Sequence, residues 1–126
     1  MNPLIINRFE SPDGELVLIE EKEGEDLMLG FEGYPWHIHS DMLIPVYGTT
    51  PEEVIRHFRD SILSDKEVIE IRKEGEKVID IFVNSNPEQE DKHQPKEETK
   101  LLRYWSGKEY IRSEQASLGN DYKSDS

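Results

Sequence analysis

Residues 50–63 read TPEEVIRHFRDSIL, and this stretch predicts the main helix of the protein. Thr50 is suited to cap the helix, Pro51 suits its first position, and Glu53 completes a capping box three residues after the cap. Five apolar side chains recur at helical spacing: Val54, Ile55, Phe58, Ile62 and Leu63. Arg59 lies off this apolar stripe, so we expect it to face away from the core. The helix is therefore predicted to bury one face.

Short apolar segments on both sides of this helix predict β-strands. Before the helix, strands are predicted over residues 3–9, 15–21 and 27–31, with turns at residues 11–14 and 23–26. After the helix, strands are predicted over residues 67–72, 77–83 and 100–105, with a short return strand at residues 109–112. The first two of these are joined at Glu74-Gly75, which gives the strongest hairpin signal in the chain.

This order of elements predicts an α+β fold with an antiparallel sheet of about five to seven strands and one main helix, residues 51–63, packed on one face. The chain has 126 residues, the size of one domain. We assign residues 1–112 to a single α+β domain. Residues 113–126 contain few apolar groups and are expected to form a flexible C-terminal tail. Residues 84–99 are polar and predict a long loop.

The composition of the chain indicates which kinds of partner and which compartment to expect. The chain carries 28 acidic and 15 basic residues, a formal net charge of −13. This charge repels nucleic acid and anionic membranes, and it attracts a basic protein. The absence of cysteine excludes disulfides and thiol catalysis. No apolar run approaches the ~20 residues that span a bilayer, and no signal segment follows Met1, so we expect a cytoplasmic protein.

One stretch looks like a functional site. Residues 31–47, FEGYPWHIHSDMLIPVY, contain one of the two tryptophans and two of the four histidines. If its centre is extended, side chains alternate between faces, so that His37, His39 and Asp41 share one face. Trp36 and Ile38 then take the other. This alternation is typical of a solvated strand face, and it also suits a binding surface or a metal site.

The metal alternative can be tested by distance. Same-face neighbours lie about 6.6 Å apart along a strand, so His37 and His39 could reach one divalent ion with bonds of about 2 Å. Asp41 would lie about 13 Å from His37 on a straight strand, too far to join them. Two histidines form an incomplete site, so no cofactor is expected. A small metal-binding protein or metal-dependent hydrolase that uses His37 and His39 remains open as an alternative.

Catalytic signatures are absent from the sequence. The chain contains no GxGxxG, Walker, HExxH or GxSxG pattern. Carboxylates are so abundant that no pair stands out as an acid–base couple. These observations favour a non-enzymatic protein and identify no catalytic residue.

Residues 33–39, GYPWHIH, followed by Asp41 and an acidic capped helix, resemble small bacterial immunity proteins of polymorphic or contact-dependent toxin systems. The resemblance covers about a dozen residues and the general build of the domain. It implies a non-enzymatic protein that binds and neutralises a toxin, with a basic toxin domain as the kind of partner its charge favours. The partner-binding residues would then be Tyr34, Trp36, His37, His39 and Asp41. An accessory domain without a separable site is the further alternative.

Overall fold

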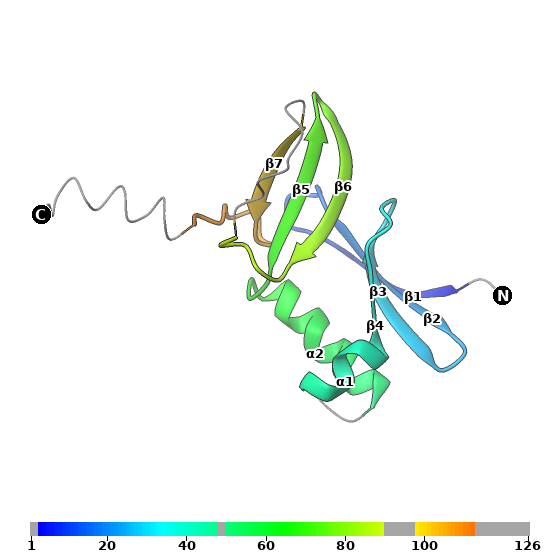
Figure 1. Ribbon diagram of the computed structural model, residues 1–126. Coiled ribbons are helices and arrows are strands. Elements are labelled where there is room, and N and C mark those ends of the chain that lie inside the picture. Colours follow the sequence, from blue (N-terminus) through cyan, green and yellow to red (C-terminus); the bar gives the residue numbers. More distant parts are fainter. Residues whose placement is uncertain (1–2, 48–49, 90–97, 113–126) are drawn as a thin grey trace, which may run out of the picture.

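Two antiparallel sheets and two helices form the fold in the computed structural model, which describes residues 3–47, 50–89 and 98–112 (Figure 1). The first sheet has the strand order β1-β2-β3-β4, with β1 Leu4–Glu10, β2 Val17–Glu23, β3 Asp26–Phe31 and β4 His37–His39. Helices α1 (Ser40–Tyr47) and α2 (Pro51–Leu63) follow. The second sheet has the order β6-β5-β7, with β5 Val68–Glu74, β6 Lys77–Asn84 and β7 Glu98–Arg103.

The α+β class and the antiparallel pairing are confirmed, but the prediction of one sheet with one helix is wrong. The first sheet ends at β4, a strand of only three residues. The chain then turns into α1, so β4 offers few backbone groups on which a fifth strand could pair. The hairpin β5–β6 instead begins a second sheet, and β7 pairs with the other side of β5.

Helix α2 forms as the capping signals predict. The Thr50 side chain accepts a hydrogen bond from the Glu53 backbone N–H at 3.2 Å, and Pro51 occupies the first helical turn. The prediction for Arg59 is wrong. Its guanidinium turns toward the first sheet, where Nη1 lies 3.0 Å from Oε1 of the buried Glu20 on β2. A buried carboxylate needs a cationic partner, which explains the inward turn of this arginine.

Helix α1 replaces the second half of the strand predicted at residues 36–41. Only residues 37–39 are extended, and Asp41 lies in the first turn of α1. The Ser40 side chain accepts a hydrogen bond from the Leu27 N–H at 3.4 Å and donates to Asp26 at 3.3 Å. These bonds fix the chain where it leaves β4. A carboxylate in a first turn also favours the helix through the helix dipole.

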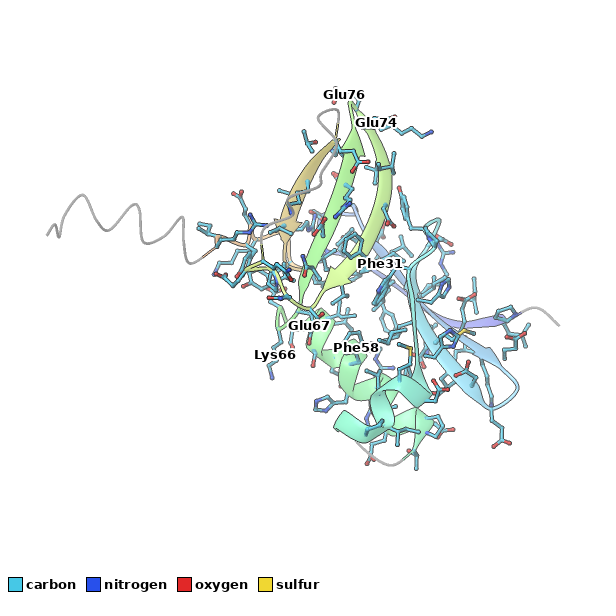
Figure 2. The ribbon with its side chains drawn as sticks, in the orientation of Figure 1. Phe31, Phe58, Lys66, Glu67, Glu74 and Glu76 are labelled. Atoms are coloured by element: carbon cyan, nitrogen blue, oxygen red, sulfur yellow. The ribbon has the colours of Figure 1, made fainter. Side chains whose placement is uncertain are left out.

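A single hydrophobic cluster joins both sheets and both helices. Its buried members are Leu16, Leu18, Leu27, Leu29, Phe31, Leu43, Val54, Ile55, Phe58, Ile62, Ile69, Ile71, Ile81, Val83 and Trp105. Figure 2 shows Phe31 between β6 and the first sheet, with Phe58 on α2 below it. The two sheets therefore share one core, which gives the first sheet one face packed inward and one face turned out.

Parts of the sequence-based prediction fall where the structure is not described. The predicted tail, residues 113–126, lies outside the described residues, and so do residues 90–97 of the predicted polar loop.

The return strand predicted at residues 109–112 is reduced to a single bridge between Arg103 and Glu109. Within the described ranges, neither helix has the length and apolar character needed to cross a bilayer.

Candidate functional site

Strand β4 places the two histidines on the outward face of the first sheet. His37 pairs with Gly30 and His39 pairs with Met28 across the β3–β4 ladder. The alternate residues of β3, Leu27, Leu29 and Phe31, belong to the buried core. Because side chains alternate along a strand, His37 and His39 point away from that core. Four ionisable side chains form two pairs there, His37 with Glu21 and His39 with Asp26, and we name these four the histidine face.

His37 is held by three neighbours. Its ring lies against Gly30, where an added methyl carbon would come within 3.1 Å of the ring carbon Cδ2. Its Nδ1 is 2.8 Å from the Pro35 carbonyl oxygen, and its Nε2 is 3.2 Å from Oε1 of Glu21. A carbonyl oxygen only accepts, so Nδ1 donates. The doubly protonated ring can donate to both oxygens at once, whereas the neutral ring can donate to only one.

His39 is held through a carboxylate that is itself fixed. Its Nδ1 is 2.7 Å from Oδ2 of Asp26, and the Ser40 hydroxyl donates to Oδ1 of the same carboxylate at 3.3 Å. Ser40 in turn accepts from the Leu27 N–H. This chain of contacts orients the ring and leaves Nε2 on its opposite edge. The side chain is partly exposed, so His39 is an oriented imidazole within reach of a partner.

Buried apolar side chains lie on the same face as these ion pairs. Ile19 and Met28 are only 7% and 5% exposed, yet neither belongs to the core cluster. The register explains their position, because Ile19 pairs with Gly30, and Met28 pairs with both Glu21 and His39. A sheet face with buried apolar groups beside two oriented histidine–carboxylate pairs differs from a uniformly solvated one.

The five residues predicted to form a binding site are not all on one face. Tyr34 and Trp36 pack against the core cluster, and the Trp36 ring lies 5.7 Å from that of Phe31 between centroids. Asp41 is exposed on α1 rather than aligned with the histidines on β4. His37 and His39 are the two that the structure brings together on the outward face.

Sequence reasoning missed both carboxylates of the histidine face. The sequence predicts Glu21 at the end of a strand over residues 15–21 and Asp26 in a turn over residues 23–26. The observed β2–β3 register pairs Glu23 with Asp26 and Glu21 with Met28. Alternation along β2 would have placed Glu21 on the same face as Ile19. The pairing of β3 with β4, which brings in the histidines, has no signal in the sequence.

Within the part of the chain that the structure describes, the histidines do not form a shared metal site. Across the described ranges, no group of three or more histidine, aspartate or glutamate side chains is arranged to hold a metal ion. His37 and His39 each contact a different carboxylate instead. A cavity of about 140 Å³ lies elsewhere, lined by residues of β7 and the segment after it, including Lys100, Tyr110 and Arg112. It is smaller than the roughly 300 Å³ at which ligand pockets usually begin.

Comparison with models of known protein families, with curated proteins and with solved structures finds no match for this chain.

Proposed function

We propose that this chain is a non-enzymatic protein-binding module of the immunity type, which binds and neutralises a basic toxin domain. The observation that carries the proposal is the histidine face. Two partly exposed histidines, each oriented by its own carboxylate, stand there beside the buried Ile19 and Met28. Met28 lies between Glu21 and His39 in the register, so it packs beside the ion pairs and leaves the polar groups to meet a partner. Preorganised polar groups lower the cost of binding and fix its orientation.

Charge supports a basic partner. The net charge of −13 accelerates encounter with a positively charged protein. Two of the carboxylates, those of Glu21 and Asp26, lie within the proposed interface. A lysine or arginine of the partner would compete with His37 for Glu21 or with His39 for Asp26. The resemblance of residues 33–39 to immunity proteins points to the same class of partner.

Binding suits the geometry of the histidines better than metal chemistry does. A shared ion would need both imidazoles aimed at one point. His37 instead directs Nδ1 to a backbone carbonyl and Nε2 to Glu21, while His39 directs Nδ1 to Asp26. The proposal therefore assigns the histidines to recognition and gives no residue a catalytic role.

The test is to co-express the chain with the product of the adjacent gene and to measure association and dissociation rates of the complex. The variants are His37→Ala, His39→Ala and Asp41→Ala, at low and physiological salt. His57→Ala on α2 is the matched control, because it removes an exposed histidine away from the proposed interface. We expect His37→Ala or His39→Ala to cost about 2 kcal/mol or more, mainly through faster dissociation.

Salt gives a second readout. Association should slow as salt rises, because the Debye length falls to about 8 Å at physiological ionic strength. Folded His37→Ala and His39→Ala variants that bind like wild type would exclude the histidine face as the interface. A neighbouring gene product that does not bind at all would remove the support for an immunity role.

A further inference from the structure

Strand β1 is an edge strand with an unusual apolar run. Leu4, Ile5 and Ile6 are 70%, 50% and 44% exposed, and they follow one another in the chain. The other exposed large apolar side chains in the described ranges, Met42, Leu101 and Ile111, stand singly. Scattered apolar residues are ordinary on a protein surface, but a contiguous group marks an interaction site.

The backbone of this strand is also available on one side. β1 lies at the end of the order β1-β2-β3-β4 and pairs only with β2 within the described part of the chain. Proteins usually protect such an edge with lysine, proline or a very short strand. β4, the opposite edge of the same sheet, has three residues. β1 has seven residues without lysine or proline. Its protection is limited to one bulge between Ile5 and Asn7 and to Arg8, whose guanidinium is already paired with Glu32.

The surroundings of this apolar run are acidic. Leu4 and Ile5 pair across with Lys22 and Glu21 of β2, near the β2–β3 hairpin. Residues 20–26 of that hairpin read EEKEGED, five acidic side chains and one lysine. Arg59 pairs with Glu20, and Arg8 on β1 pairs with Glu32. The summed charge of residues 20–26 stays negative when both arginines are included. A segment that docks here must therefore offer apolar side chains together with positive charge.

We infer that β1 is a docking edge for an extended, basic and apolar segment of a partner protein, which adds to the first sheet as a fifth strand. Backbone hydrogen bonds to β1 would supply affinity, and Leu4, Ile5 and the acidic hairpin would supply selectivity. A second copy of this chain fits less well, because each copy carries a net charge of −13. The inference rests on the proposed protein-binding function and identifies the kind of segment that the partner presents.

The probe is a synthetic peptide of alternating lysine and valine, long enough to span the seven residues of β1. Its control is the same peptide N-methylated throughout, which keeps charge and side chains but lacks backbone N–H donors. The test variant is Leu4→Lys/Ile6→Lys. The matched control variant is Met42→Lys/Ile111→Lys, which adds the same two charges at exposed apolar positions elsewhere. Affinity is measured by titration calorimetry, and the protection of backbone amides by hydrogen exchange.

We expect the parent peptide to bind wild type and to slow exchange of outward-facing amides in residues 4–10. The N-methylated peptide, and the Leu4→Lys/Ile6→Lys variant, should each bind at least about tenfold more weakly, while Met42→Lys/Ile111→Lys binds like wild type. Equal binding by the two peptides, or by the two variants, would show charge attraction alone and overturn the inference. Edge amides already protected in the free protein would overturn it too. Protection that rises with protein concentration would identify a second copy, and constant protection would identify the chain itself.

These results separate the docking edge from the proposed function. Failure of the peptide to bind, with intact binding of the neighbouring gene product through His37 and His39, would remove only the β1 inference. Binding of the peptide without binding of that product would remove only the toxin partner.

Discussion

Arg103 and Asp13 join the two sheets through a two-point ion pair. The guanidinium nitrogens Nη1 and Nη2 of Arg103 lie 2.7 and 3.3 Å from the two carboxylate oxygens of Asp13, across 90 positions of sequence. Arg103 is buried at the end of β7, and it also donates to the carbonyl oxygens of Tyr104 and Trp105. Asp13 lies in the turn between β1 and β2 and accepts from Ser11. The contact therefore fixes the β1–β2 turn against the second sheet.

This ion pair predicts an acid-sensitive contribution to stability. The Arg103 guanidinium and the Ser11 hydroxyl hold the pKa of Asp13 well below its usual value of 3.8. A depressed pKa gives stability that is full above the unfolded pKa and is lost as the pH falls toward the folded one. Asp13→Asn should lower the free energy of unfolding by about 1 kcal/mol near neutral pH, a modest figure because more than a third of the Asp13 side chain is exposed.

Urea unfolding of wild type and Asp13→Asn at a series of pH values measures the effect. The difference between the two proteins should be constant above about pH 5 and should shrink below about pH 4. A difference that does not change with pH would show that the variant acts by packing rather than by charge.

The contribution of Glu67 to the free energy of unfolding should depend on pH in the opposite direction. Partial burial raises its pKa above the usual value of 4.5, because desolvation disfavours the ionised carboxylate. The folded state is therefore penalised as the pH rises through that pKa. Glu67→Gln should unfold at a higher urea concentration than wild type near neutral pH and at the same concentration in acid. Glu76→Gln is the control, since Glu76 stands exposed at the β5–β6 tip (Figure 2). Equal effects of the two variants would contradict the role of burial.

The ion pair of the partly buried Arg59 with the buried Glu20 predicts strong coupling between helix α2 and β2. Arg59→Met removes the cation and leaves the Glu20 carboxylate buried, with the amide of Asn7 3.5 Å away. Breaking one side of a buried pair costs about 3–5 kcal/mol, whereas replacing both sides is often close to neutral. We expect Arg59→Met to be severely destabilised and Glu20→Met/Arg59→Met to recover most of the loss. Thermal unfolding gives both values, with Arg56→Met as the exposed control.

These two residues also show how far sequence reasoning reaches. The helix of residues 51–63 was predictable because its cap, its first-turn proline and its apolar stripe are all local signals. The inward turn of Arg59 was not, because its cause is Glu20, a residue on a strand 39 positions away. Alternation along β2 places Glu20 on the same face as the buried Leu16 and Leu18, but nothing near it in the sequence identifies the cation on α2 that pairs with it.

The candidate site divides in the same way. Alternation predicted that His37 and His39 share a face, and they do. It also placed Asp41 with them, which fails because Ser40, held by Asp26 and the Leu27 N–H, ends the strand and begins α1. The division into two sheets depends on the length of β4, and no local pattern at residues 36–41 marks where that strand ends.

The last prediction concerns Gly30, because the ring of His37 in the histidine face lies against this residue. A methyl group at this position would lie 2.8 Å from the Trp36 carbonyl oxygen and 3.1 Å from Cδ2 of His37. The first contact is with the backbone just before β4, so the chain that enters β4 must move. Gly30→Ala should therefore lower the free energy of unfolding by about 1–3 kcal/mol and loosen the contact of His37 with Glu21.

The double variant Gly30→Ala/His37→Ala tells the two contacts apart. Removing the imidazole relieves the ring contact but leaves the clash with the Trp36 carbonyl. We expect the double variant to remain less stable than His37→Ala alone, with chemical shifts along β4 displaced in both Gly30→Ala proteins. If Gly30→Ala loses stability only when His37 is present, the added methyl group clashes with the His37 ring alone and not with the Trp36 carbonyl oxygen. If Gly30→Ala is as stable as wild type, β4 does not pack closely on β3 at this position. The orientation of His37 is then not fixed by its contact with Gly30.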